Sequence, residues 1–443
     1  MTYFIYFFSF IILISVIVFV HELGHFSFAR LFGVRVLDFS IGFGKPIRSW
    51  TTKSNTVFNL RILPFGGYVQ MNSRDISSGE NKDDSFESKK YYQKILITLG
   101  GPLFNFLLAL FILFIINLYG VSKVIPIIGD IIPNSLAEFS GLQKKDLILD
   151  IDDHEISSFS DAQLILSKRL GDSGALKIKI LRGKEIVFHE IQISEWLSKE
   201  EPGNLLFSLG IVPPIEPIIG NVLSSSPAEE GGLLPRDKII KINEKNINDW
   251  SEIRDIVNNE EGKEISVTLE REGFLRTVNI KPRLSDDVLN WQIGVSSAFI
   301  LSPNAKKIIQ FGLIRSFQNS VSQTYSVIEN SLIFFKKIIL GQISSKNLGG
   351  PVMIGQYAGE SIIYGGIYSF IYLMAFISIS LGLVNLFPLP VLDGGQALIL
   401  TIERIIGREL PEKLLDIFYK LGGMFLVFLF IFVFLNDIFR IIL

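Results

Sequence analysis

The chain has 443 residues, a formal net charge of −2 and a mean hydropathy of +0.40, and 48% of its residues are hydrophobic. This composition is too apolar for an ordinary soluble enzyme and indicates a membrane protein with soluble parts. The nearly balanced charge gives no sign of nucleic-acid binding, and the absence of cysteine excludes disulfides, thiolate metal sites and a cysteine nucleophile.

The first 20 residues have no charged side chain and are long enough to cross a bilayer as a helix, without the basic start of a signal peptide. They lead directly into the sequence HELGH at residues 21–25. His21 and His25 are expected one turn apart on one helix face, where both can bind a single Zn²⁺. Glu22 is then placed to take a proton from the attacking water rather than to bind the metal. The alternative is that these are polar residues at the membrane edge.

Residues 26–94 contain 11 Lys and Arg against 6 Asp and Glu, so the positive-inside rule predicts a cytoplasmic loop and an N-terminus outside. Within this loop, residues 56–71 predict two strands around Pro64-Phe65-Gly66-Gly67, in a β-hairpin too apolar for a free surface. The hairpin either packs against the bilayer as a small sheet or offers an edge strand that pairs with an extended substrate.

Residues 95–122 are uncharged and predict the second span. This span opens with Gly100-Gly101-Pro102 and contains Asn105. Small residues allow two helices to approach closely, and an asparagine at this depth needs a partner. Packing between helices is the favoured role of the segment.

The segment from Lys123 to about Pro282 contains an internal repeat with a period of 91 residues. Ile128-Gly129-Asp130 corresponds to Ile219-Gly220-Asn221, and the pattern small-x-Ala-x-x-x-Gly-Leu-x-x-x-Asp-x-Ile recurs in both copies. Such a repeat predicts two copies of one domain of about 90 residues each. Both copies resemble PDZ domains of the bacterial protease type, which capture peptides by strand addition. Alternatively, they act as spacers or size filters without binding a peptide.

Residues 306–340 place apolar side chains at helical spacing among Lys and Arg, which predicts an amphipathic helix or a broken pair of helices. Residues 361–392 are uncharged and predict the third span. Residues 401–420 contain four basic side chains and form a second cytoplasmic loop by the same rule. The uncharged run 421–436, extended back through residue 417 with Lys420 snorkelling, predicts a fourth span that returns the C-terminus to the outside.

The third span ends in the sequence NLFPLPVLD at residues 385–393, where two prolines break the helix at membrane depth. Irregular backbone at that depth is tolerated only where it is buried in protein or lines a cavity. Asp393 directly follows this apolar run and is the best candidate for a carboxylate ligand, because His154 and His189 lie in the soluble insert without ligand spacing. We expect those two histidines at the surface. The alternative for Asp393 is that it caps the next helix.

Together these segments predict a polytopic α-helical membrane protein with about four transmembrane helices, a membrane-associated β-hairpin on the cytoplasmic side and two extracytoplasmic PDZ-like α+β domains. Both termini and the PDZ-like domains are expected on the outer side of a bacterial cytoplasmic (inner) membrane. The expected parts are a first membrane part at 1–122, PDZ-like domains at 123–212 and 213–296, an amphipathic segment at 297–360 and a second membrane part at 361–443.

Taken together, these motifs resemble the site-2 protease family of intramembrane zinc metalloproteases, and within it the bacterial regulator of sigma-E protease type with two PDZ domains. The resemblance covers the whole chain and is carried by HELGH, the glycine-rich hairpin, Gly101-Pro102-x-x-Asn105-Phe106, the paired repeats and residues 385–394. It implies one Zn²⁺ per chain bound by His21, His25 and Asp393, with Glu22 as the catalytic acid and base. It also implies that two segments help to hold the substrate, through Asn385, Pro388 and Pro390 and through Phe65, Gly66, Gly67 and Tyr68.

The substrates that this resemblance implies are single-span membrane proteins already cut on their outer side, such as anti-sigma factors, or signal-peptide remnants. They are expected to be hydrolysed within or near the transmembrane segment, in regulated intramembrane proteolysis. Peptide ends at the PDZ domains and the lipid bilayer are further expected partners, and nucleic acid is not. A catalytically silent PDZ scaffold or chaperone is the alternative, but it has no need for three ligands and a base together. A zinc transporter would need more polar residues along the spans.

Overall fold

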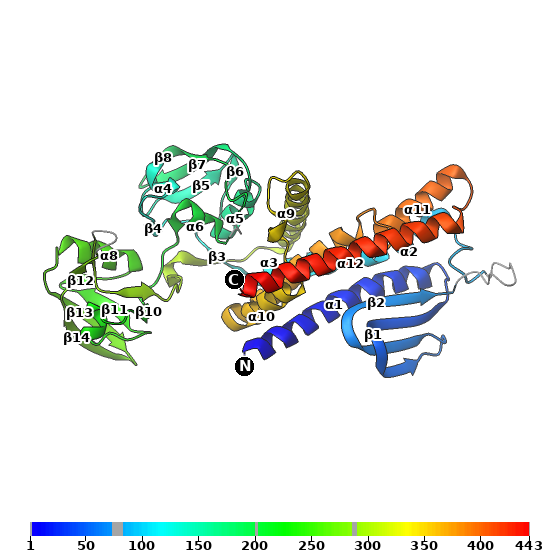
Figure 1. The fold of residues 1–443 in the computed structure, drawn as a ribbon, viewed down its shortest axis with the longest axis horizontal. Helices are drawn as coiled ribbons and strands as arrows, with labels where there is room; N and C mark the ends of the chain where they lie inside the picture. The colour runs from blue at the N-terminus through cyan, green and yellow to red at the C-terminus, as the bar shows by residue number, and fades with distance from the viewer. Residues whose placement is uncertain (1, 73–82, 200–202, 286–289, 443) are drawn as a thin grey trace. The chain divides into compact units, whose positions relative to one another are not determined.

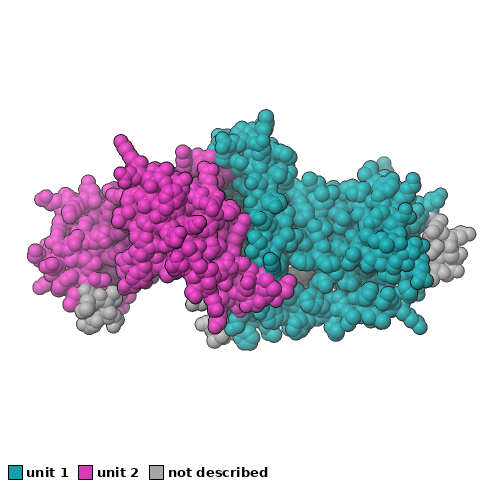
Figure 2. Space-filling model, turned by 90° about the horizontal axis from the view of Figure 1, so that it is seen from above, with its two compact units in different colours: residues 1–120, 310–336, 345–443 teal, residues 121–309, 337–344 magenta. Residues whose placement is uncertain are grey.

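The computed structural model describes residues 2–72, 83–199, 203–285 and 290–442, and the chain forms two compact units. Unit 1 comprises residues 1–120, 310–336 and 345–443, and unit 2 comprises residues 121–309 and 337–344 (Figure 2). Unit 1 contains the long apolar helices, and unit 2 contains the repeats.

Four of the described helices are long and apolar enough to cross a membrane, which agrees with the predicted number. They are α1 (Thr2–Leu31), α3 (Gly100–Tyr119), α10 (Pro351–Asn385) and α12 (Glu412–Ile442). Three of them, α1, α3 and α10, pack against one another, whereas α12 contacts α10 and stays almost wholly exposed (Figure 1). Apolar helices with this much exposed surface are suited to a lipid environment.

The ends of two spans differ from the prediction. The second span begins at Gly100, because a separate helix, α2 (Tyr91–Thr98), takes up the first residues of the uncharged run. The third span begins at Pro351 rather than at residue 361, and it bends at Gly366, whose φ of 66° interrupts the helix. The predicted break after it is present, since residues 386–392 are not helical and α11 (Asp393–Ile406) begins at Asp393.

A buried carboxylate anchors α12 to the start of α10. Asp437 is 2% exposed and accepts hydrogen bonds of 2.9–3.0 Å from the backbone N–H groups of Gly350, Val352 and Met353. These are N–H groups that a helix N-terminus leaves unpaired, and the helix dipole favours a negative charge at that end. The acid that follows the fourth apolar run therefore has a structural role.

A sheet formed by β1 (Val36–Thr51) and β2 (Val57–Met71) packs against α1. Residues 38–41 of β1 have partners on both sides, residues 67–70 on one and residues 57–60 on the other. The prediction of two strands around residues 64–67 is therefore wrong about their pairing, because residues 38–41 of β1 lie between the two arms of β2. The arm formed by residues 67–71 lies at an edge of this sheet, with no further strand beside it among the described residues.

The amphipathic helix begins later than predicted. It is α9 (Leu313–Ile339), whereas residues 306–309 form strand β18 (Lys306–Ile309), which pairs with β3 (Val121–Val124). Residues 306–309 thus form a strand because of a partner that is far away in the sequence, which local periodicity cannot reveal.

Unit 2 contains two copies of one small α+β fold, in agreement with the repeat. Each copy has a four-stranded antiparallel sheet, in the order β6-β5-β7-β8 in the first and β12-β11-β13-β14 in the second, with one longer helix, α5 or α8. The first copy comprises β4 (Asp130–Ile131), α4 (Leu136–Phe139), β5 (Leu147–Ile151), β6 (His154–Glu155), α5 (Phe159–Ser167), β7 (Gly174–Arg182), β8 (Glu185–Ile193), α6 (Leu205–Leu209) and β9 (Ile211–Val212). The second comprises β10 (Ile219–Val222), α7 (Pro227–Glu230), β11 (Lys238–Ile242), β12 (Lys245–Asn246), α8 (Trp250–Asn259), β13 (Ile265–Arg271), β14 (Phe274–Ile280), β15 (Arg283–Leu284), β16 (Trp291–Gln292) and β17 (Val295–Ser297).

The aspartate that recurs in the repeat is a structural residue. Asp146 is 0% exposed and accepts two hydrogen bonds of 2.8 Å from Arg182, and Asp237 is 1% exposed and accepts bonds of 2.6 and 2.7 Å from Arg271. Because each guanidinium donates to a buried carboxylate, the pKa of both arginines is raised. An equivalent ion pair therefore links the residue before β5 to the end of β7 in the first copy, and the residue before β11 to the end of β13 in the second.

His189, which was expected at the surface, is partly buried and hydrogen-bonded to the Ser140 carbonyl at 2.7 Å.

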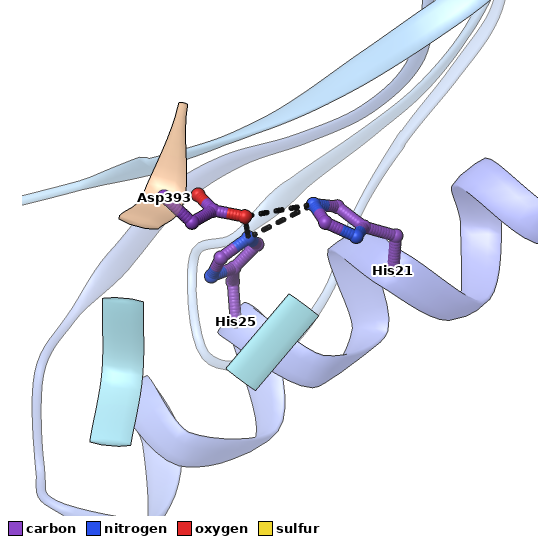
Figure 3. A group of neighbouring side chains, drawn as sticks. All are labelled: His21, His25 and Asp393. Carbon is purple, nitrogen blue, oxygen red and sulfur yellow. Dashed lines mark hydrogen bonds and ion pairs between the residues drawn. The ribbon is translucent and has the colours of Figure 1, made fainter. Parts of the chain in front are cut away.

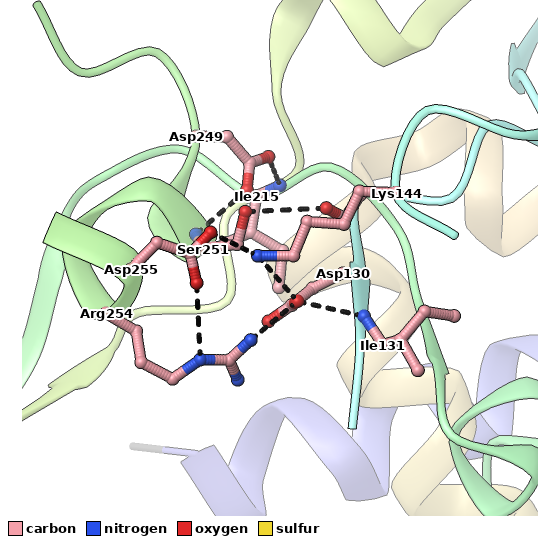
Figure 4. Close-up of polar contacts among 9 residues, drawn as sticks. Asp130, Ile131, Lys144, Ile215, Asp249, Ser251, Arg254 and Asp255 are labelled. Atoms are coloured by element: carbon pink, nitrogen blue, oxygen red, sulfur yellow. Dashed lines mark hydrogen bonds and ion pairs between the residues drawn. The ribbon is translucent and has the colours of Figure 1, made fainter. Parts of the chain in front are cut away.

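Charged residues join the two copies within unit 2 (Figure 4). Asp130 of the first copy accepts a hydrogen bond of 2.8 Å from Arg254 of the second. Lys144 lies 3.2 Å from Asp130 and 2.6 Å from Asp255. These alternating charges hold β4 and the loop before β5 against the first turns of α8.

Candidate metal centre

Three side chains from two helices that are far apart in the sequence meet at one point (Figure 3). His21 and His25 lie one turn apart on α1, with ring centroids 5.0 Å apart and Nε2 atoms 3.3 Å apart. Asp393, the first residue of α11, brings its Oδ2 atom to 3.2 Å from His21 Nε2 and 3.5 Å from His25 Nε2. Among the described residues, these three form the group of ligand atoms able to hold a metal ion.

The distances between these atoms fit a bound zinc ion. Ligands of a tetrahedral Zn²⁺ at roughly 2.0–2.1 Å lie about 3.3–3.4 Å from one another. His25 Nδ1 is 2.8 Å from the Ile97 carbonyl and donates to it, so Nε2 of the neutral ring has a lone pair. That lone pair faces Asp393 Oδ2, which is buried and accepts no hydrogen bond within the described part of the chain. Two electron-pair donors that face each other this closely repel unless a metal cation or a proton lies between them.

The structure does not favour the helix-cap alternative for Asp393. Leu392 occupies the N-cap position of α11, and no side chain caps this helix end. The non-helical residues 386–392 instead place the Asp393 carboxylate against α1. The break at Pro388 and Pro390 thus serves to bring the acid to the two histidines.

Glycines allow α3 to approach the candidate metal centre. A Cβ atom on Gly24 of α1 would lie 2.1 Å from the Gly100 carbonyl oxygen, so the two backbones touch at this crossing. A Cβ atom on Gly101 would lie 2.4 Å from His25 Nε2 and 2.6 Å from His21 Nε2. The close helix approach that Gly100-Gly101 predicts is confirmed, and it positions α3 directly beside the candidate ligand atoms.

Glu22 lies beneath the edge of the β1–β2 sheet. Its side chain is 8% exposed, and a Cβ atom on Gly67 would lie 2.8 Å from Glu22 Cγ and 2.7 Å from the Ser40 carbonyl oxygen. Only glycine allows the edge arm to pass this close to the candidate base. The backbone of the edge arm therefore runs next to Glu22.

The predicted substrate-binding residues fall into two groups. Gly67 faces Glu22, but the Tyr68 hydroxyl accepts a hydrogen bond of 2.8 Å from Arg61 within the sheet, and its ring stacks under that guanidinium. Gly66 has a φ of 145° and lies against Phe43, whereas the Phe65 side chain lies outside the described residues.

The second group lies on the chain leading to Asp393. Asn385 is the last residue of α10 and is partly buried, and its side chain makes no hydrogen bond among the described residues. Pro388 is exposed, and Pro390 packs near Gly422 of α12. No hydrogen bond in the described part of the chain joins Asn385 to the candidate metal ligands, so the role of these three residues stays a prediction.

Sequence reasoning missed two groups that hold the imidazoles. The Ile97 carbonyl is a backbone group, and no residue type signals it. The Asn105 Nδ2 atom lies 3.1 Å from His21 Nδ1, although packing was the favoured role for this segment. Asn105 comes four residues after Gly101 and therefore lies on the same helix face, which is a signal that the sequence did contain.

Comparison with known proteins agrees with this geometry. The family description "Peptidase family M50" matches residues 9–429. The chain belongs to peptidase family M50. It is 34% identical over 98% of both chains to "Regulator of sigma E protease" of Haemophilus influenzae, and 32% and 31% identical, again over 98% of both chains, to "Regulator of sigma-E protease RseP" of Salmonella typhimurium and of Escherichia coli. A solved PDZ domain of an SdrC-like protein from Listeria monocytogenes aligns with 20% of this chain and 92% of its own, at 18% identity and a TM-score of 0.18, which is too low to bear on the fold.

This M50 peptidase is an intramembrane zinc metalloprotease of the site-2 type. The family match explains why two histidines, a glutamate and a distant aspartate occur together in a chain with four membrane-length helices. The silent scaffold is not favoured, since the set of side chains that metalloprotease chemistry needs is complete.

Proposed function

We propose that this M50 peptidase binds one Zn²⁺ per chain through His21 Nε2, His25 Nε2 and Asp393 Oδ2. The observation that carries the proposal is the mutual distance of these atoms, 3.2–3.5 Å, which matches the spacing of ligands around one tetrahedral zinc ion. Two neutral imidazoles and one carboxylate are a donor set that zinc prefers, and three protein ligands leave a fourth position open. When bound, zinc supplies Lewis-acid chemistry at the scissile carbonyl.

Glu22 acts as the general base and acid. It takes a proton from the water molecule that attacks the peptide carbonyl carbon, and it passes that proton to the nitrogen of the leaving amine as the C–N bond breaks. Its position one residue after His21 on α1 and its burial beneath the sheet edge suit this role. A shielded carboxylate is available for proton transfer without competition from bulk water.

The substrate is held in extended form along the edge arm at residues 67–71. A helical substrate hides its carbonyl groups in hydrogen bonds, so it must unwind before hydrolysis. The free edge of β1–β2 offers backbone donors and acceptors to such a strand, and Gly67 brings this edge beside Glu22. Asn385, Pro388 and Pro390 contribute from the segment where α10 ends and the chain turns toward Asp393.

The substrate class is a single-span membrane protein whose outer domain has already been removed, such as an anti-sigma factor, or a signal-peptide remnant. The similarity to proteins named as regulators of sigma-E supports the first kind. The protein lies in the bacterial inner membrane, with both termini and the PDZ-like repeats outside and residues 26–94 in the cytoplasm. The basic composition of that loop supports this orientation.

Membrane proteomics tests the substrate class. Cells with the Glu22→Gln variant should accumulate single-span fragments that wild-type cells remove, and these fragments should lack their outer domains. Glu360→Gln, a change to another glutamate of the membrane helices, is the matched control and should accumulate none. Accumulation of only soluble or multi-span proteins would contradict the assigned substrate class.

The repeats act as a size filter, because paired domains obstruct access to a buried site even without affinity for a peptide. The backbone N–H of Ile125 donates to the Ala305 carbonyl at 2.8 Å, so a short flexible loop can replace residues 126–304 without stretching the chain. We expect this variant to cut membrane proteins with intact outer domains, which the wild type spares. Slower cutting of trimmed substrates would instead indicate peptide capture, and wild-type rates on both classes would exclude both roles.

A further inference from the structure

The side chain of Asn105 is buried next to a candidate zinc ligand. Asn105 is 0% exposed, and its Nδ2 atom lies 3.1 Å from His21 Nδ1, on the side of the ring away from Asp393. Its Oδ1 atom is buried and has no hydrogen-bond partner within the described part of the chain. A buried polar atom without a partner costs about 1–3 kcal/mol.

The zinc-binding role proposed for His21 determines which hydrogen bond its ring needs. To bind a metal through Nε2, a neutral imidazole must hold its proton on Nδ1, and that N–H then needs an acceptor. His25 meets this need with the Ile97 carbonyl at 2.8 Å. At His21, the Asn105 amide occupies the equivalent position.

A carboxamide can present either a donor or an acceptor at the same place. A half-turn about the Cβ–Cγ bond exchanges Oδ1 and Nδ2 with little change in shape. After this exchange, Oδ1 accepts from His21 Nδ1–H, which fixes the tautomer that zinc requires.

We propose that Asn105 is a positioning residue of the metal centre, whose Oδ1 atom accepts the Nδ1–H of His21 and holds its Nε2 lone pair toward zinc. This inference rests on the proposed ligand role of His21. The backbone of α3 is held independently of the amide, because Ser378 donates to the Asn105 carbonyl at 2.9 Å and Gly100 packs on Gly24. The amide group is therefore available for orienting the imidazole rather than for holding the helix.

The test is the zinc affinity of the purified full-length protein, measured by competition with a chelator. Asn105→Leu removes the acceptor at similar volume and should weaken zinc binding by about 10- to 100-fold, the usual loss on removing a group that orients a metal-bound histidine. Asn105→Asp keeps an acceptor oxygen and should stay within a few fold of wild type. A donor role predicts no such rescue by aspartate, and a packing role predicts that Asn105→Leu lowers the thermal stability of the metal-free protein.

The chain offers a matched control on the same helix. Asn117 is also 0% exposed, and it donates to the Leu113 carbonyl at 2.8 Å and to Gln323 at 3.2 Å, away from the histidines. Asn117→Leu should leave zinc affinity unchanged. The thermal stability of the metal-free variants shows whether each is folded, and if Asn105→Leu does not fold, the aspartate variant still decides between acceptor and donor.

The outcomes separate this inference from the proposed function. If His21→Ala loses zinc while Asn105→Leu binds it as wild type does, the site stands and the role of Asn105 is refuted. The same conclusion follows if Asn105→Asp loses zinc as strongly as Asn105→Leu. If His21→Ala itself keeps wild-type affinity, the ligand assignment fails, and the inference fails with it.

Discussion

Gly101 of α3 lies so close to His25 of α1 that a Cβ atom on the glycine would come within 2.4 Å of the imidazole Nε2 atom. Real Cβ atoms do not approach other heavy atoms this closely, so a side chain here requires the ring or the helix to move. The site therefore depends on the absence of a side chain at this position as much as on the presence of the ligands.

Gly101→Ala should consequently damage zinc binding. The added methyl group pushes the His25 and His21 rings off their common point, and we expect at least a tenfold loss of zinc affinity together with loss of cleavage. Zinc content after equilibration with a chelator measures the effect. Gly423→Ala on α12, where a Cβ atom would meet nothing within 4 Å, is the control. Equal zinc affinity in both variants would show that α3 does not constrain the imidazoles.

The candidate metal ligands could be predicted from the sequence, because the type of side chain determines whether a residue can bind a metal ion. Few other interpretations fit a HELGH sequence that follows one apolar run and an aspartate that follows another. The structure brings His21, His25 and Asp393 together. The Ile97 carbonyl could not be predicted, since every residue offers the same backbone group. The sequence indicates that Asn105 needs a partner at membrane depth and favours packing for its segment, because the sequence alone does not show which residue it faces.

Elements whose form depends on distant partners were also predicted less well. The two arms of β2 were expected to pair with each other, but β1 inserts between them. Residues 306–309 follow a helical period but extend as β18, because β3 supplies a neighbouring strand. Helix periodicity reports local burial only, so strand pairing between remote segments escapes it.

Gly67→Ala should lower cleavage without removing zinc. A methyl group there meets Glu22 Cγ at 2.8 Å and the Ser40 carbonyl oxygen at 2.7 Å, so either the base or the edge arm must shift. We expect roughly a tenfold or greater fall in kcat, with unchanged metal content, because a displaced catalytic group is costly. Gln70→Ala, an exposed position on the same arm, should behave as wild type. Loss of zinc in Gly67→Ala would mean that the sheet supports the metal rather than the base.

Asp393→Asn should remove both zinc and activity, since a neutral amide is a poor ligand for Zn²⁺. Asp437→Asn is the matched control. Asp437 is also a buried aspartate, but it lies on α12 and accepts hydrogen bonds from backbone N–H groups. This substitution should lower stability by about 1–2 kcal/mol through loss of charge at the start of α10, while zinc content stays at the wild-type level. Wild-type zinc in Asp393→Asn would reduce Asp393 to a structural residue.

The proposed orientation in the membrane can be tested by thiol labelling, because the chain contains no cysteine. Ser54 lies exposed in the turn between β1 and β2, and Lys184 lies exposed in the turn between β7 and β8. Single cysteines at these positions should react with an impermeant reagent from opposite sides, Lys184→Cys in intact spheroplasts and Ser54→Cys only after lysis. Reaction of both in intact spheroplasts would refute the orientation.

The zinc content and the cleavage rate of purified wild type and Glu22→Gln, measured side by side on one single-span substrate, test the central claim most directly. Glutamine keeps the shape of the side chain and leaves His21, His25 and Asp393 in place, so both proteins should hold one zinc ion per chain. Cleavage by the variant should fall by at least about 100-fold, because it has lost the group that takes the proton from water. A Glu22→Gln protein that retains zinc and cleaves at close to the wild-type rate would contradict the account.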